Sequence, residues 1–335
     1  MQLNRCLLGL LLAALVTLRA EPVPAMTNNP PAVIVLVGAP GEEAYGEKFA
    51  EWAQHWEKAC RETGASAVTI GLTNQTQGTD YQQLKQALLD APKESENELW
   101  LVLIGHGTYD GKEAKYNLRG PDVSAAELAS WLQPFRRPLI LINCTSSSGP
   151  FLNKLSAPGR IVLTATKSGH EQNYARFGQF ISEAIIDPEA DLDKDGQTSL
   201  LEAFLTAAYR VADFYKTEGR LATEHPLLDD NGDGRGTPAD WFRGVRAVKK
   251  SSEGVAADGL RAHQFHLLRS QQERELSPAL RSRRDQLELS LAKLRESKGQ
   301  LSEDDYYRQL EPLMIELAMI YQKAAAASSA EVNKP

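Results

Sequence analysis

The sequence has few cysteines, no excess of positive charge and no apolar run long enough to cross a bilayer. Its 3 cysteines in 335 residues are too few for the disulfide framework of a small exported domain. Its formal net charge of −7 gives no reason to expect a nucleic-acid partner. The apolar stretch near the start, Leu7–Val16, is too short for a membrane span. Gly38–Gly41 is not a phosphate-binding loop, because the Lys and Ser/Thr that would follow are missing.

The first 20 residues have the pattern of a secretory signal peptide. Arg5 supplies the basic start, Leu7–Val16 the apolar core and Ala20 a small residue for cleavage. Residues 21–31, rich in proline and polar groups, are predicted to be a linker. We therefore expect a secreted or periplasmic protein whose mature chain keeps Cys60 and Cys144. Cys60 shares a helical apolar face with aromatic residues, so we expect it to be a small buried side chain.

Short apolar runs alternate with amphipathic stretches through the first two thirds of the chain. Runs bounded by turn residues are typical of strands buried on both faces of a parallel sheet. The predicted strands are Ala32–Val37, Ala67–Leu72, Leu99–Ile104, Leu139–Ile142 and Arg160–Ala165, with Tyr116–Leu118 as an edge extension. The predicted helices are Glu43–Thr63, Tyr81–Leu89, Ser124–Leu132 and Asn173–Ile186. This alternation predicts an α/β fold, a doubly wound and mostly parallel sheet with helices on both faces, over residues 32–250.

The C-terminal region has longer amphipathic patterns without strands. We predict one helix over Leu260–Glu275, a second from Pro278 after a Ser277 cap, and a third after Ser302. Residues 258–325 are thus expected to form a helical hairpin, which contacts either its own domain or a partner. The Ala-rich tail, residues 326–335, is predicted to be disordered.

Two of the predicted strands end in residues that could carry out chemistry. Leu99–Ile104 is followed by His106 between two glycines, and Leu139–Ile142 is followed by Cys144. Catalytic groups in open α/β sheets lie beyond the carboxyl ends of the strands, so both side chains are expected at one edge. An imidazole beside a thiol can hold it as the nucleophilic thiolate. The amides of Gly107 and Cys144 could then form an oxyanion hole. A serine of the run 146–148 is an alternative nucleophile, without a visible third group to tune it.

This arrangement resembles the caspase-fold cysteine peptidases of clan CD. A strand ending in His–Gly, then a helix, then a strand ending in Cys is similar to their catalytic segment. Arg160–Thr166 and Glu171–Tyr174 resemble the fifth strand and the pocket-lining loop of the legumain-type branch. The resemblance implies a cysteine endopeptidase with His106 as general base and Cys144 as nucleophile, cleaving a peptide or protein substrate through an acyl-enzyme. The pocket-lining loop adds Ser168, His170 and Glu171 as candidate substrate contacts.

An alternative function is a catalytically inactive caspase-like module used for binding. The family usually has glycine soon after the cysteine, whereas Thr145–Ser148 intervene here before Gly149. The helical hairpin would then be the contact surface, since a fold does not by itself imply an activity.

An acidic stretch, Asp191–Glu202, matches the calcium-binding loop of an EF-hand. Asp191, Asp193 and Asp195 occupy places one, three and five, and Gly196 allows the sharp turn at place six. Gln197 would offer its backbone carbonyl, Ser199 stands at place nine and Glu202 at place twelve. We therefore predict a structural Ca²⁺ that ties two helices together.

A second stretch, Asp229–Asp240, begins with the same pattern. Asp229, Asn231 and Asp233 occupy places one, three and five, and Asp240 stands at place twelve. Pro238 and the missing helical pattern leave a second calcium site and a glycine-rich turn as equal alternatives. His263 and His266, on the predicted C-terminal helix, have no suitably spaced partners for a metal site.

Overall fold

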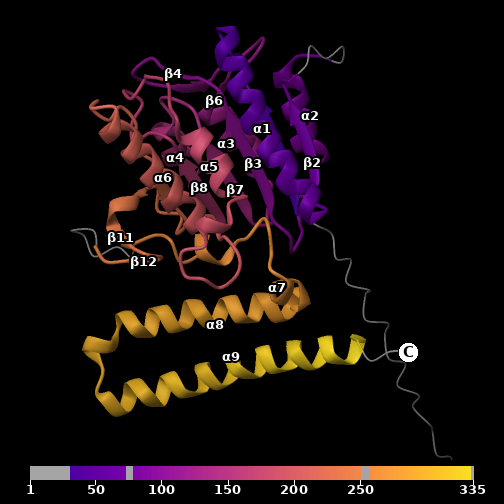
Figure 1. Ribbon diagram of the computed structural model, residues 1–335, viewed down its shortest axis with the longest axis vertical. Coiled ribbons are helices and arrows are strands. Elements are labelled where there is room, and N and C mark those ends of the chain that lie inside the picture. The colour runs from indigo at the N-terminus through magenta and orange to yellow at the C-terminus, as the bar shows by residue number, and fades with distance from the viewer. Residues whose placement is uncertain (1–30, 73–77, 250–256, 333–335) are drawn as a thin grey trace, which may run out of the picture.

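The computed structural model describes residues 31–72, 78–249 and 257–332 (Figure 1). The predicted signal peptide and nearly all of the predicted linker lie outside the described residues. A seven-stranded sheet in the order β10-β9-β8-β7-β3-β1-β2 forms the centre of the molecule. Its strands are β1 (Ala32–Val37), β2 (Ser66–Ile70), β3 (Leu99–Ile104), β7 (Leu139–Asn143), β8 (Arg160–Thr164), β9 (Leu227–Asp229) and β10 (Thr237–Pro238). The first five run parallel, and β9 and β10 add an antiparallel edge.

Helices cover both faces of this sheet, which confirms the predicted doubly wound fold. Because successive side chains of a strand point to opposite faces, each parallel strand contributes to two cores. The first core lies under α1 (Glu43–Thr63), α5 (Phe177–Ala184) and α6 (Leu200–Thr217). The second core lies under α2 (Asp80–Asp90), α3 (Ala125–Leu132) and α4 (Gly149–Leu155). Among the described helices, none is long and apolar enough to span a membrane.

Smaller elements decorate the two edges of the sheet. Of the predicted edge extension Tyr116–Leu118, only Tyr116 lies in a strand, and that strand belongs to a separate antiparallel sheet. This sheet starts directly after His106 and lies at the top of Figure 1. Its strands are β4 (Gly107–Tyr109), β5 (Ala114–Tyr116) and β6 (Val123–Ser124). The other short elements of the described chain lie in connecting segments, η4 in the C-terminal region: β11 (Phe242–Arg243), β12 (Arg246–Ala247), η1 (Pro188–Ala190), η2 (Ala239–Trp241), η3 (Ala262–Gln264) and η4 (Lys298–Gln300).

The C-terminal region forms a helical hairpin at the opposite end of the molecule (Figure 1). It consists of α7 (Gln271–Glu275), α8 (Pro278–Glu296) and α9 (Glu303–Val332). Ser277 caps α8 as predicted, by accepting a hydrogen bond from the Leu280 amide. The predicted helix over 260–275 was wrong. Only η3 and α7 are helical there, because the Phe265 carbonyl accepts a bond from the Leu200 amide and the segment follows the first acidic loop.

The tail prediction was also wrong in part. Helix α9 continues through most of the tail that we expected to be disordered and ends at Val332. Alanine has the highest helix propensity, and an alanine run carries the helix past residue 325.

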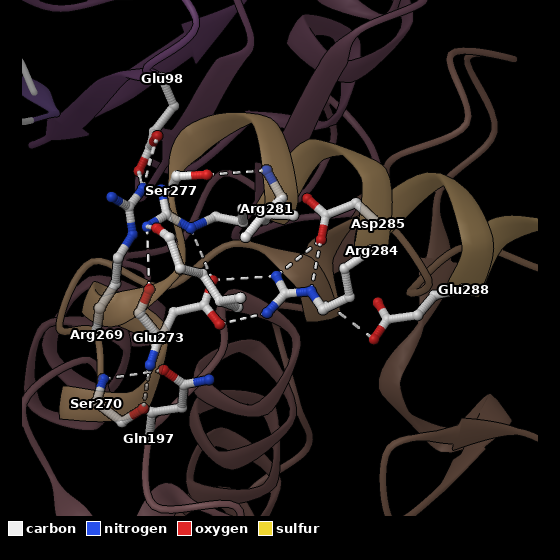
Figure 2. A network of polar contacts seen from close by, with 12 residues as sticks. Glu98, Gln197, Arg269, Ser270, Glu273, Ser277, Arg281, Arg284, Asp285 and Glu288 are labelled. Carbon is white, nitrogen blue, oxygen red and sulfur yellow. Dashed lines mark hydrogen bonds and ion pairs between the residues drawn. The ribbon is translucent and has the colours of Figure 1, made fainter. Parts of the chain in front are cut away.

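An ion pair joins the hairpin to the sheet at the amino ends of its strands. Arg269 donates to both carboxylate oxygens of Glu98, which is almost fully buried just before β3 (Figure 2). The molecule therefore has a carboxyl edge, where β3 and β7 end near His106 and residues 144–148, and an amino edge with the hairpin.

Candidate functional site

His106 lies on the α1 face of the sheet, at the carboxyl edge. Its ring packs edge-on against Tyr45 and Phe49, with centroids 5.0 and 5.2 Å away, and Tyr174 lies at 6.2 Å. Its Nε2 lies 3.1 Å from the carbonyl oxygen of Pro40. A carbonyl only accepts, so in the neutral ring Nε2 carries the proton and Nδ1 keeps the lone pair. The imidazole is thus oriented by a backbone group, as a general base requires.

Cys144, the predicted nucleophile, is buried in the core. Its exposed fraction is 0%, and it belongs to the core under α1 and α5 together with Ile140 and Ile142. Its Cβ lies so close to Gly178 of α5 that a methyl group there would approach it to 2.8 Å. Burial raises the pKa of the Cys144 thiol well above its ordinary value, so the thiolate is disfavoured. This placement does not support a nucleophilic role for Cys144, and that role stays a prediction.

Both amides of the predicted oxyanion hole already have acceptors, and the oxyanion hole stays a prediction. The Cys144 amide donates to the Leu103 carbonyl at 2.9 Å and so extends the pairing of β7 with β3. The Gly107 amide donates to the Ser146 hydroxyl at 3.3 Å. Neither N–H group is left for a developing negative charge.

The Ser146 side chain contacts the residue that follows His106. Its hydroxyl accepts from the Gly107 amide and donates to the Gly107 carbonyl at 3.0 Å. Gly107 is required there, because a Cβ would come within 2.3 Å of the Ser146 carbonyl oxygen. Even spacing from Ile140 and Ile142 predicts a buried face for Cys144, whereas the contact of Ser146 arises in the turn after β7 ends.

The predicted substrate-contact loop does lie beside residues 146–148. Ser147, in the left-handed region with φ of 54°, donates its amide to the Glu171 carbonyl at 2.8 Å. The Glu171 carboxylate is already occupied, since it accepts from the Lys167 amide and pairs with His225. His170 is exposed, with its ring edge-on to Tyr109, and the Ser168 carbonyl accepts from Thr166. The structure therefore brings these segments together, with their polar groups mainly bonded to one another.

The first acidic loop has its ligand groups converged at the amino edge. Ligand oxygens of Asp191, Asp193 and Asp195 all lie within 4.8 Å of one another. Both oxygens of Asp191 accept backbone amides of the loop, from Asp195 at 3.2 Å and Gly196 at 3.0 Å. Oxygen ligands held this closely on a short loop are the donor set that Ca²⁺ prefers. The donor set of the loop therefore fits calcium.

Glu202 closes this loop from the first turn of α6. Its Oε1 accepts from the amides of Leu192 and Asp193, at places two and three of the loop. Its Oε2 accepts from the Ser199 amide and hydroxyl, each at 2.8 Å, which also caps the helix. Burial, together with the charges of Asp193 and Glu202, raises the pKa of Asp195, as expected for carboxylates crowded together.

His263 is a residue of this site that sequence reasoning missed. Its Nε2 lies 3.0 Å from Asp193 Oδ2, and its ligand atom lies within 4.8 Å of those of Asp193 and Glu202. The prediction that His263 has no acidic partner was therefore wrong. Spacing could not reveal the pair, because η3 reaches the loop from 70 residues away along the chain.

The second acidic loop repeats the bonding of the first at its start. Asp229 accepts the amides of Gly232 and Gly234, each at 2.9 Å, as Asp191 does at its own loop. Asp240, the predicted place-twelve ligand, is wrong: it is exposed and pairs with Lys249 Nζ at 2.5 Å. After the loop the chain enters β10, which pairs with β9, so no exit helix brings residue 240 back.

Asp258 takes the place that Glu202 has in the first loop. Its Oδ1 accepts from the amides of Asp230 and Asn231, at places two and three, at 3.0 and 3.2 Å. Its Oδ2 accepts from the Thr237 hydroxyl, at place nine, at 2.6 Å. Burial, and next the charge of Asp230, raises the pKa of Asp258 to about 8. A pattern search could not have found Asp258, which lies well beyond the twelve-residue window.

Comparison with known proteins gives fold-level likenesses only. No protein-family model matches the chain, and no curated protein matches it. Among solved structures it is similar to the Drosophila initiator caspase Dronc, with a TM-score of 0.43 and 15% identity over 62% of this chain and 82% of that one. It is also similar to Raptor of Chaetomium thermophilum, with a TM-score of 0.33 and 10% identity over 48% of this chain and 18% of that one.

Proposed function

We propose that the protein is an exported, calcium-stabilised binding module whose α/β domain resembles a cysteine peptidase but does not use Cys144 for catalysis. The observation that carries this proposal is the burial of Cys144 under α1 and α5, with its amide bonded to β3. A thiol that is inaccessible and held neutral cannot attack a peptide carbonyl. The sequence predicted a cysteine endopeptidase of the legumain-type branch. The burial of Cys144 does not support that activity, and both the activity and the branch stay predictions.

Enzyme assays test the absence of thiol chemistry directly. We expect no labelling of Cys144 by a peptidyl electrophile and no hydrolysis of a fluorogenic peptide library that depends on this residue. Hydrolysis that is present in the wild type and lost in Cys144→Ala would overturn the proposal. Cys60→Ala is the matched control, because Cys60 is likewise buried in the same core.

The role proposed for calcium is to hold the amino edge together. The first loop would bind it through Asp191, Asp193, Asp195, the Gln197 carbonyl, Ser199 and Glu202. The second loop would bind it through Asp229, Asn231, Asp233 and Asp258. Support comes from the converged oxygens of the first loop and from the matching bonds of Glu202 and Asp258. In the second loop the ion would fasten segments distant in sequence, because Asp258 leads into the chain that carries the hairpin.

Two matched substitutions test the second loop. Calcium should raise the melting temperature of the wild type, since a ligand that binds only the native state stabilises it. Asp258→Asn should reduce the number of bound calcium ions by one, whereas Asp240→Asn should leave it unchanged. The reverse result would restore the sequence prediction, and no calcium binding to the wild type would reject the role.

The hairpin offers the binding surface of the proposed module. Helix α9 buries Tyr306 and Ile320 on one face and exposes Tyr307, Met314, Ile315 and Met319 on another. Exposed carboxylates, among them Asp304 and Glu311, flank this second face. An amphipathic partner helix with basic flanks would complement it. Binding of such a peptide should weaken in Met314→Glu. It should not weaken in Leu221→Glu, the control, because Leu221 is an exposed apolar residue outside the hairpin. Self-association seen in sedimentation and lost in Met314→Glu would instead identify a second copy of this chain as the partner.

A hydrolase that uses Ser146 is the second candidate function. Two contacts favour this function. The Pro40 carbonyl lies within hydrogen-bond distance of His106 Nε2, and the Ser146 hydroxyl donates to the carbonyl of Gly107, the residue after His106. In this candidate function the Ser146 hydroxyl would have to leave the Gly107 carbonyl and donate to Nδ1 of His106. Labelling by a fluorophosphonate, lost in both Ser146→Ala and His106→Ala but kept in Ser148→Ala, would establish it.

Export is proposed from the signal-like residues 1–20. The mature protein recovered from its native host should begin after Ala20 or Ala25. An intact Met1 on the protein from the host would reject export.

A further inference from the structure

Strand β2 forms one end of the seven-stranded sheet and, among the described strands, pairs only with β1 (Figure 1). Its peptide groups alternate in direction along the strand. The Ser66 amide donates to the chain just before β1 at 3.1 Å, so Ser66, Val68 and Ile70 turn their peptide groups toward β1. The N–H and C=O groups of Ala67 and Thr69 therefore point away from the sheet, and within the described chain nothing pairs with them. We call this open side of the strand the β2 edge.

The β2 edge lacks the features that usually protect an edge strand from pairing. The strand contains no proline and no charged residue, and its register with β1 is continuous, without a bulge. Val68, in the middle of the strand, is 46% exposed. Helix α2 does not cover it, because a groove of about 720 Å³ lies between α2 and this part of the sheet, with Ser66, Val68 and Ile70 in its lining. An open edge of this kind is a template for a further strand.

The positions of the open peptide groups favour a second copy of β2 as the added strand. In an antiparallel pair about a two-fold axis at Val68, Ala67 of each copy lies opposite Thr69 of the other. Because both residues turn their peptide groups outward, each of these pairs exchanges two hydrogen bonds across the interface. Val68 then lies opposite Val68 of the other copy, in the closely spaced kind of pair in which side chains touch. The exposed valine is thus covered by its own counterpart.

The charges on α1 complement each other in the same arrangement. Glu57 lies over the end of β2, where its Oε1 accepts from the Thr69 hydroxyl at 2.7 Å, while the Ala65 amide bonds back to the Cys60 carbonyl. Helix α1 and β2 therefore run in opposite directions, and Arg61 lies toward the start of the strand. A two-fold axis at the middle of β2 brings Glu57 of one copy toward Arg61 of the other. Within one chain these two side chains are loosely paired, at 3.9 Å, and that of Arg61 is 69% exposed, so both are available to the other copy.

We propose that the β2 edge joins two copies of this chain into a dimer, by antiparallel pairing of β2 with β2 about a two-fold axis at Val68. The two sheets become one continuous sheet, and Glu57 and Arg61 form ion pairs between the copies at both ends of the paired strands. This dimer is independent of the proposed calcium binding and of the exposed face of α9.

Sedimentation equilibrium of the full mature chain tests the dimer. We expect the wild type to show a monomer–dimer equilibrium, and Val68→Lys to raise the Kd of the dimer at least about tenfold, because two lysines would then lie opposite each other. Leu89→Lys is the matched control, since Leu89 is an exposed apolar residue on α2 outside the groove, and it should leave the Kd unchanged. Both positions are exposed, so the fold should persist, and circular dichroism checks this. A wild type that stays monomeric at every concentration, or a dimer that is lost in Met314→Glu and kept in Val68→Lys, would overturn the proposal.

A pair of charge reversals tests the two-fold register. Arg61→Glu and Glu57→Arg should each weaken the dimer, because each places like charges opposite one another across the interface. An equimolar mixture of the two variants should recover dimers, since every contact between positions 57 and 61 then joins opposite charges. Each variant also disturbs the pair within its own chain, and mixing cannot repair that contact, so recovery reports on the interface alone. A mixture that stays as monomeric as each variant by itself would overturn the proposed register.

Discussion

The packing of Cys144 against α5 makes a quantitative prediction for Gly178→Ala. A Cβ at this position would come within 2.6 Å of the Trp52 ring and within 2.8 Å of the Cys144 Cβ. Both neighbours are fully buried, so neither can move into solvent. Overpacking of a core on this scale costs about 1–3 kcal/mol, and alanine in a helix returns at most about 1 kcal/mol relative to glycine. We expect the free energy of unfolding to fall by about 1–2 kcal/mol.

Gly46→Ala in α1 is the matched control. Its Cβ would meet Pro40 at 3.5 Å, an ordinary van der Waals contact. Only the helix propensity then changes, so this variant should gain up to about 1 kcal/mol. Urea unfolding followed by tryptophan fluorescence measures both free energies. If Gly178→Ala were as stable as Gly46→Ala, Cys144 would not lie beneath α5, and its assignment as a nucleophile would be open again.

A double-mutant cycle isolates the Cys144 contact. Cys144→Gly removes the Cβ that the new methyl group would meet, while the Trp52 contact stays. The loss caused by Gly178→Ala should therefore be smaller in the Cys144→Gly background, by roughly 1 kcal/mol for residues in contact. Strict additivity of the two substitutions would contradict the geometry.

Four further predictions follow from other parts of the structure. Burial raises the pKa of the thiols of Cys60, to about 11, and of Cys144. Both thiols should therefore react with Ellman's reagent only after unfolding, and a fast-reacting thiol in the native protein would contradict this. Glu202→Gln should lose most of the stabilisation that calcium gives through the first loop. At a free calcium concentration of one hundred times the Kd, this stabilisation is about 2.7 kcal/mol. If calorimetry showed the same rise in melting temperature with calcium in this variant as in the wild type, Glu202 would be excluded as a ligand. Folding lowers the pKa of His266 from 6.5 to about 3, so between these two pH values the unfolded chain binds a proton that the folded chain does not. The free energy of unfolding measured in EDTA should therefore be highest above pH 6.5 and should fall as the pH is lowered toward 3. The slope should approach about 1.4 kcal/mol per pH unit, and it should flatten in His266→Phe if urea unfolding is followed against pH. Arg269→Met should destabilise the protein by about 3–5 kcal/mol by leaving the buried Glu98 unpaired, whereas Arg308→Met, at an exposed pair, should cost under about 1 kcal/mol; equal losses would contradict the burial of the first pair.

The α/β fold could be predicted because its signals are local. β1 and α1 begin and end at the predicted residues, since an apolar run bounded by turns and a repeat of 3.6 residues each report on their own segment. The segment 260–275 failed for the same reason. It has an amphipathic pattern, but Phe265 bonds through its carbonyl to Leu200 of the first acidic loop, and only η3 and α7 within the segment are helical.

The topology of the sheet accounts for the position of the candidate site. The strand ends brought His106 and residues 144–148 to one edge, as a parallel sheet requires. Even spacing puts Cys144 on the same α1 face of the sheet as His106, and the packing of α1 and α5 over that face buries the thiol. The contact of Ser146 with Gly107 forms in the turn after β7 has ended, where a strand pattern gives no information.

By itself, the sequence determined the order of strands and helices, the two acidic loops and the segments that meet at the carboxyl edge, because these depend on neighbours along the chain. Only the tertiary structure decided that Asp258 rather than Asp240 closes the second loop and that His263 reaches the first. Each of these depends on side chains that approach from distant segments, and the position of such segments is a property of the packed molecule as a whole.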